Sequence, residues 1–193
     1  MRAGRGSRNI PAPLDGVRRW GVKFCVKDIL VHACCAPCAC VFDAPQKFFF
    51  NGDNFDTREE YDRRLGAMLT LAPDAVIEPY RPQKFENCAK CIEYRLTRCA
   101  EYARAHGFGA FTTTLTVSPH KNTAQINEIG RAVGAKIGIE FIELDLKRTN
   151  PKNDAINRAY GAWGGFARSV ARSKELGLYR QNYCGCAGAT RNG

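Results

Sequence analysis

The sequence contains no long apolar run. No stretch approaches the roughly 20 consecutive apolar residues that a membrane-spanning helix needs. The first apolar run, Ile29 to Ala33, is too short for the core of a secretory signal. We therefore expect a cytoplasmic protein without a membrane partner. Hydrophobic residues make up 45% of the 193 residues and charged residues 25%, which is typical of a globular chain and not of a disordered one.

Acidic residues are also scarce. Nineteen acids face 29 Lys and Arg residues, which gives a net charge of +10. This balance favours an anionic partner, with nucleic acid first, although solubility or a basic tail explains it equally simply. Asp15 is the single acid among five arginines near the N-terminus (Arg2, Arg5, Arg8, Arg18 and Arg19). We predict a basic, flexible arm over residues 1–28 and one domain over residues 29–193.

Apolar segments of strand and helix type alternate along this domain. Short apolar runs predict strands, and runs with apolar residues three and four apart predict helices. Such alternation is typical of an α/β fold with a mostly parallel sheet and flanking helices. Residues 147–165 are polar and irregular, and we predict an insertion around 149–163. The predicted strands cover 29–33, 47–50, 75–78, 110–117 and 139–144, and the predicted helices cover 57–71, 87–106, 126–137 and 166–176.

Ten cysteines are the most unusual feature of the composition. A disulfide scaffold and a metal or redox site are the two explanations, and a reducing compartment favours the second. Four cysteines fall within residues 34–40, directly after the first predicted strand, where sites form in parallel sheets. Cys88 and Cys91 form a C-x-x-C at a predicted helix start, which suits zinc, an iron–sulfur cluster or a dithiol pair.

Cys184 and Cys186 form a third group near the C-terminus. A C-x-C bridge is strained, so the pair is either a labile redox couple or two ligands of one metal. Cys25 and Cys99 fit no group, and we interpret them as structural. Four thiolates satisfy either an iron–sulfur cluster or a zinc ion. Because eight cysteines are arranged in motifs, we favour redox chemistry over a purely structural zinc site.

Four motifs resemble one known family. They are VHACCAPC at residues 31–38, NCAKCIEYRL at 87–96, FTTTL through SPHKN at 111–122, and SKELGLYRQNYCGC at 173–186. In this order they resemble the QueH type of epoxyqueuosine reductase. The resemblance implies a Rossmann-like, HUP-type domain and an oxidoreductase that completes queuosine synthesis in tRNA. That reaction removes the epoxide oxygen of epoxyqueuosine at the anticodon wobble position in a two-electron reduction.

The resemblance also implies a [4Fe-4S] cluster, a tRNA partner with the epoxide in its anticodon loop, and an electron donor that it does not identify. Cys184 and Cys186 would be a redox-active, disulfide-forming pair. Cys38 is a further candidate ligand, to the cluster or to an additional mononuclear iron or zinc ion. The implied cluster ligands are Cys34, Cys35, Cys88 and Cys91.

Three hypotheses follow from this picture. A metal would bind the epoxide oxygen as a Lewis acid, and Tyr179, Tyr183 or His120 would supply protons. Phosphates of the RNA would meet Lys121, Arg180 or Arg95. Only nine residues separate Cys38 from Phe48, so the first crossover helix is expected to be shortened or lost. The rival interpretations are a non-enzymatic zinc-binding nucleic-acid module and a metal-free thiol–disulfide oxidoreductase.

Overall fold

The structure, a computed structural model, describes residues 28–43, 46–147 and 151–184, with the backbone alone for residues 151–154. Nearly all of the predicted basic arm lies outside these residues, as do Cys25 and Cys186. Among the described residues, no helix is both long and apolar enough to cross a membrane.

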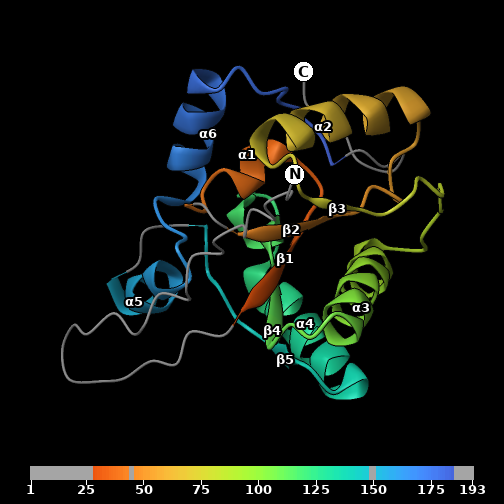
Figure 1. Ribbon diagram of the computed structural model, residues 1–193, viewed down its shortest axis with the longest axis vertical. Coiled ribbons are helices and arrows are strands. Elements are labelled where there is room, and N and C mark those ends of the chain that lie inside the picture. Colours follow the sequence, from red (N-terminus) through yellow and green to blue (C-terminus); the bar gives the residue numbers. More distant parts are fainter. Residues whose placement is uncertain (1–27, 44–45, 148–150, 185–193) are drawn as a thin grey trace, which may run out of the picture.

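Five parallel strands form one sheet in the order β3-β2-β1-β4-β5 (Figure 1). The central strand β1 is buried along its whole length and pairs with β2 and β4. From β1 the chain moves outward to β3, then returns past β1 to β4 and β5. This is the doubly wound arrangement of a Rossmann-like domain, which confirms the predicted fold class. The strands are β1 (Ile29–Ala33), β2 (Lys47–Phe50), β3 (Val76–Ile77), β4 (Ala110–Thr113) and β5 (Glu140–Phe141).

Three long helices begin at capping residues. The side chains of Thr57, Asn87 and Asn122 each accept a hydrogen bond from a backbone N–H of the first turn. They start α2 (Arg58–Leu71), α3 (Cys88–Ala105) and α4 (Thr123–Ile137). Helix α3 packs on β1 and β4, and α4 lies beside it against β5. The predicted apolar stripe of α3 is buried: Ile92, Leu96, Cys99, Ala100 and Ala103.

Three predicted strands are shorter in the structure, and β3 covers only Val76–Ile77 of the predicted residues 75–78. The sequence predicts one strand over residues 110–117, but β4 ends at Thr113, whose hydroxyl accepts a hydrogen bond from the Leu115 N–H. That bond caps the 3-10 turn η1 (Thr114–Val117). The strand predicted over residues 139–144 forms only β5. Beyond it the Thr112 hydroxyl, not a backbone N–H, donates to the Ile142 carbonyl at 2.7 Å.

The segment after the first strand is reduced to one turn, α1 (Ala36–Ala39). The expected shortening is therefore present, and β1 still pairs with β2. Helix α1 packs against α2 and against α6 (Gly165–Glu175).

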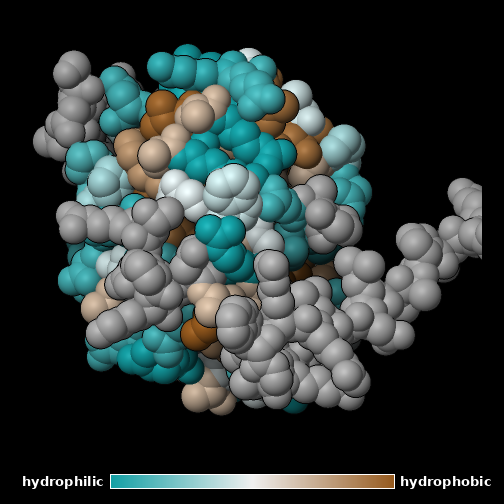
Figure 2. Space-filling model, turned by 90° about the vertical axis from the view of Figure 1, so that its left-hand side faces the viewer, coloured by the Kyte–Doolittle hydropathy of each residue, from teal (hydrophilic) through white to brown (hydrophobic). Residues whose placement is uncertain are grey.

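Residues predicted as an insertion contain a helix, α5 (Pro151–Ala159). An isolated antiparallel bridge joins Phe42 to Ala162, and the Asn157 amide donates to the Asp145 carbonyl at 2.8 Å. Figure 2 views the molecule from the side of α5 and α6, where small apolar patches interrupt a mostly hydrophilic surface. The exposed large apolar side chains of this region are Ile156, Trp163, Phe166 and Leu176.

Candidate functional site

Three cysteines follow the carboxyl end of β1. Cys34 and Cys35 are buried, and Cys38 in α1 is half-buried. A hydrogen bond with Cys35 and burial raise the pKa of Cys34 well above its usual value. For Cys35, the hydrogen bond with Cys34 lowers the pKa, but the one with Cys38 and burial outweigh it and raise the value to about 12. The thiols of Cys34 and Cys35 are therefore protonated in the metal-free protein, and metal binding must displace their protons.

The remaining cysteine of this run points elsewhere. The Cys40 thiol donates to the Pro37 carbonyl at 3.2 Å and also faces the Ser169 carbonyl of α6. We assign it to the packing between α1 and α6. Cys99 is fully buried on the apolar face of α3, which confirms its structural interpretation.

Cys88 and Cys91 lie in the first turn of α3. Asn87 caps this turn by accepting from the Lys90 N–H at 3.0 Å. Cys91 is buried and faces the thiols after β1: burial raises its pKa, and negative charge on Cys184 or Cys34 would raise it further. Cys88 is exposed at the first residue of the helix. Three of the four predicted cluster ligands therefore lie in the buried part of the site, and the fourth at its surface.

Arg95 lies one helical turn beyond Cys91 and is fully buried. Its Nε donates to the Cys91 carbonyl at 3.4 Å, and its two terminal nitrogens have no nitrogen or oxygen partner. The other polar contact of its side chain is with the Cys34 sulfur. Burial lowers the pKa of Arg95, but thiolates at Cys91, Cys34 and Cys184, as in a metal-bound state, would outweigh this effect and raise it. A buried cation with unused donors is costly, so this position suits an anionic group. It is not available as the surface phosphate contact predicted from sequence.

Cys184 returns the C-terminal segment to the same site. The Nζ of Lys121 lies 3.5 Å from its sulfur. Burial lowers the pKa of Lys121, but the neighbouring Cys184 raises it, so the ammonium stays charged. Lys121 was a predicted phosphate contact, and the structure places it beside a thiol. The partner thiol, Cys186, lies outside the described residues.

The other predicted contacts lie farther from the thiols. His120 is exposed. The Tyr179 hydroxyl donates to the Glu60 carboxylate at 2.9 Å, and Arg180 donates to the Ser173 hydroxyl at 2.6 Å. Tyr183 contacts the buried Arg64 through its ring and its backbone carbonyl. These positions leave the Tyr179 hydroxyl occupied within the protein.

Sequence reasoning missed His32 and Arg64. His32 is fully buried in β1 and shares a 2.9 Å hydrogen bond with the Thr113 hydroxyl through Nδ1, while Nε2 has no partner. Burial, and then Arg95, lower its pKa well below the usual value, so it is neutral. Arg64 is 1% exposed and pairs with Glu60, which is equally buried. The sequence held a signal for Arg64. Arg64 and Glu60 lie at helical spacing from Tyr61 and Met68, on the buried face of α2.

The thiols do not form a closed site for a single ion. Among the described residues, no three His, Cys, Asp or Glu side chains are gathered as ligands of one metal. The donor chemistry nevertheless fits a thiolate-bound cluster, because several thiols face one another and the unpartnered nitrogens of Arg95 face them. A cluster held by four thiolates carries net negative charge, which the Arg95 cation would stabilise.

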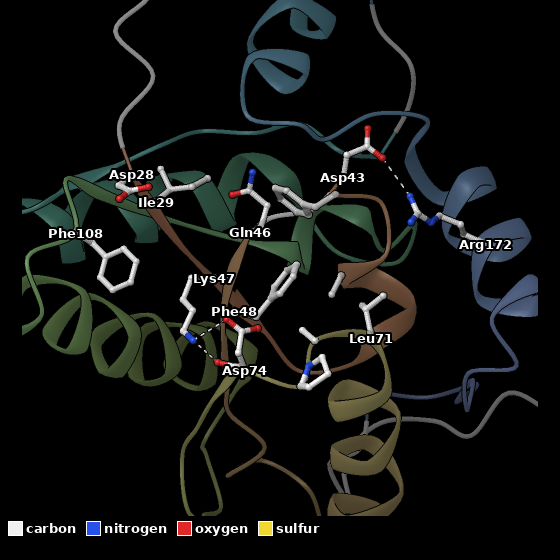
Figure 3. A pocket seen from close by; sticks show the side chains of 14 residues that line it. Asp28, Ile29, Asp43, Gln46, Lys47, Phe48, Leu71, Asp74, Phe108 and Arg172 are labelled. Atoms are coloured by element: carbon white, nitrogen blue, oxygen red, sulfur yellow. Dashed lines mark hydrogen bonds and ion pairs between the residues drawn. The ribbon is translucent and has the colours of Figure 1, made fainter. Parts of the chain in front are cut away.

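A cavity of about 570 Å³ lies at the opposite edge of the sheet (Figure 3). Its lining includes Ile29 and Phe48 from the amino ends of β1 and β2. Charged side chains on its wall pair with one another, as Lys47 does with Asp74 at 2.9 Å. No cysteine of the described residues lines it. This hollow is therefore separate from the described thiols.

A doubly wound sheet with buried thiols at its switch point defines a Rossmann-like protein with a cysteine-rich candidate site. Within that class, residues 29–192 match the family described as epoxyqueuosine reductase QueH, and the chain belongs to this family. A protein of that name from Thermotoga maritima is 30% identical over 82% of this chain and 88% of its own length. One from Streptococcus pyogenes is 30% identical over 84% and 70%, and one from Staphylococcus aureus 27% identical over 82% and 73%.

Proposed function

We propose that this protein reduces epoxyqueuosine in tRNA to queuosine with an iron–sulfur cluster held by its clustered cysteines. The observation that carries the proposal is the group of buried thiols beside the Arg95 guanidinium, whose terminal nitrogens lack a nitrogen or oxygen partner, in a chain of the epoxyqueuosine reductase family. The reaction breaks both carbon–oxygen bonds of the epoxide and forms a carbon–carbon double bond. It consumes two electrons and two protons, and the oxygen leaves as water.

The proposed cluster ligands are those expected from the sequence: Cys34, Cys35, Cys88 and Cys91. Cys38, which is hydrogen-bonded to Cys35, is the proposed ligand of any second, mononuclear iron or zinc ion. When bound, a [4Fe-4S] cluster supplies single electrons at low potential. The cations of Arg95 and Lys121 would stabilise the negative charge of the ligated thiolates.

Cys184 is the proposed redox partner together with Cys186. Oxidation of two thiols to a disulfide releases two electrons and two protons, which is the stoichiometry that the epoxide requires. The Lys121 ammonium, 3.5 Å from the Cys184 sulfur, is placed to hold a thiolate or to donate a proton to the leaving oxygen. The pair must then be reduced again by a donor outside this chain.

The tRNA substrate must present its modified base to a partly buried site. Bases read by proteins in RNA loops are commonly splayed out of the stack, and reaching these thiols would require this. The net charge of +10 supports binding to the phosphate backbone.

The test begins with the chain purified without oxygen. We expect broad visible absorption with about four irons and four sulfides per chain. Incubation with epoxyqueuosine-containing tRNA and dithionite as the electron source should then convert the modified nucleoside to queuosine, measured by mass spectrometry of digested tRNA. A colourless protein that holds only zinc after attempted cluster reconstitution would contradict the proposal and favour the zinc-binding nucleic-acid module.

A further inference from the structure

Arg64 lies in α2, far in sequence from the cysteine motifs, but it contacts the C-terminal thiol segment directly. Its Nε donates to Glu60 Oε1 at 2.6 Å, within the same helix. Its two terminal nitrogens donate to the backbone carbonyls of Cys184 at 3.2 Å and Tyr183 at 3.3 Å. One guanidinium therefore joins two segments that are about 120 residues apart in sequence.

The surroundings of Arg64 fix its orientation. The Cζ atom lies 4.3 Å from the ring centre of Phe55 and 5.5 Å from that of Tyr183. The second oxygen of Glu60 accepts from the Tyr179 hydroxyl at 2.9 Å, so the carboxylate is also tied to the C-terminal segment. A buried ion pair is retained without penalty only when its remaining donors and acceptors are satisfied, and here each has a partner.

Arg64 also faces the thiols that follow β1. Burial lowers its pKa, but Glu60 and thiolates at Cys35 and Cys34, as in a metal-bound state, would outweigh this and raise it. The guanidinium is therefore near enough to the proposed cluster ligands to interact with their charge, while it holds the segment that carries the proposed redox thiol. Figure 1 shows the C-terminal segment running from α6 toward α2.

We propose that Arg64 is a positioning residue that clamps the Tyr183–Cys184 backbone against α2, so that the Cys184 thiol is held at the site formed by Cys34, Cys35 and Cys91. This inference rests on the proposed function and assigns a residue to it. The clamp needs a planar fork that donates in several fixed directions, which Arg supplies and the single ammonium of Lys does not.

The test compares Arg64→Met and Arg64→Lys with the matched control Arg63→Met. Arg63 also pairs with Glu60, at 3.0 Å, but its side chain is 58% exposed. The reduced, cluster-loaded full chain is treated with iodoacetamide, and alkylation of Cys184 is followed over time by peptide mass spectrometry. Iron content and the kcat and KM for epoxyqueuosine tRNA are measured in parallel.

We expect both Arg64 variants to alkylate at Cys184 at least about tenfold faster than the wild type, because two charge-assisted hydrogen bonds are lost. Iron content should stay unchanged, and kcat should fall by about tenfold or more with little change in KM. The control should stay within about twofold of wild type in every measurement. A merely structural role would lower folding stability without selective exposure of Cys184.

Removal of Arg64 alone leaves Glu60 buried and unpaired, which can prevent folding. The double variant Glu60→Gln with Arg64→Met removes both charges and provides the decisive measurement in that case. Unchanged Cys184 alkylation in any folded Arg64 variant overturns the inference. Because alkylation needs no tRNA, a wild-type protein that fails to reduce epoxyqueuosine would refute the proposed function and leave the clamp to be judged by Cys184 exposure.

Discussion

The side of the sheet where its strands begin, here called the amino edge, differs from the side where they end, the carboxyl edge, in how the charged side chains are paired. At the amino edge, the cavity of Figure 3 is lined by ions that neutralise one another. Lys47 pairs with Asp74 at 2.9 Å, and Arg172 pairs with Asp43 at 3.1 Å. At the carboxyl edge, the terminal nitrogens of Arg95 have no nitrogen or oxygen partner. The two cations at the amino edge are thus paired with carboxylates, whereas Arg95 is not.

Other buried polar atoms also lack a partner. The Asn54 amide follows β2, and the hydroxyls of Thr114 and Thr116 follow β4. Asn127 in α4 and Asn157 in α5 carry such atoms too, so an unpartnered neutral group does not by itself locate a site. Arg95 differs because it is a charged side chain, and a buried charge without a full set of partners is far more costly than a neutral group.

The strongest way to break this comparison is to remove a thiol from the carboxyl edge. We expect Cys91→Ser to lose most of its iron and sulfide, and to reduce epoxyqueuosine at least about 10³-fold more slowly, because a cluster normally needs all of its thiolates. Iron analysis, visible absorption and the tRNA assay measure these effects.

Cys99→Ala is the matched control on the same helix. Its thiol is also buried but packs in the core, so iron content and turnover should persist while stability falls by about 1 kcal/mol. Equal iron loss in both variants would mean that the carboxyl edge is not the cluster site.

Arg95→Met should separate function from stability. In the metal-free protein, replacing a buried guanidinium that lacks partners with an apolar side chain should stabilise the fold by about 1–3 kcal/mol. Turnover by the loaded protein should nevertheless fall by about 10²-fold, because a preorganised cation is lost. Urea unfolding and the tRNA assay give the two values.

Arg98→Met provides the contrast one turn farther along α3. Arg98 is paired with Glu78 at 2.7 Å and its side chain is 35% exposed. Its loss should cost about 1 kcal/mol or less and leave turnover unchanged. If Arg95→Met destabilises the metal-free protein as Arg98→Met does, the unpaired charge is not waiting for an anion.

The carboxyl edge was predictable from sequence only in part. The alternation of apolar runs places the thiol groups at the end of β1 and the start of α3. The burial of Arg95 and Arg64 was not predicted, because charged side chains usually belong to the surface and their cost of burial depends on tertiary partners. A one-turn α1 also separates Cys40 from the other thiols, and periodicity does not resolve a helix that short.

The role of Asp43 at the amino edge can be tested through the pH dependence of folding stability. Its carboxylate accepts from the Trp163 indole at 2.6 Å and from Arg168 and Arg172. Burial raises its pKa, but these donors outweigh burial and lower the value. A lowered folded-state pKa means that the stabilisation is complete above the unfolded value of about 3.9 and is lost as the pH falls through the folded value.

Asp43→Asn should therefore destabilise the fold by about 1 kcal/mol at neutral pH, since the carboxylate is half-exposed. The difference from wild type should shrink as the pH falls through the lowered folded-state pKa of Asp43. Thermal unfolding at several pH values tests this. A difference that stays constant with pH would show that shape, and not charge, holds α6 to this loop.

The smallest effect is expected where charge is paired and exposed. The Lys47 side chain is 36% exposed and that of Asp74 is 73% exposed, so their ion pair is strongly screened. Lys47→Met should change stability by about 0.5 kcal/mol or less and leave both iron content and turnover at the wild-type level. This variant alters the wall of the cavity in Figure 3, so it tests whether that cavity takes part in catalysis. A turnover defect with normal iron would give the amino edge a role in the reaction and end the division between the two edges.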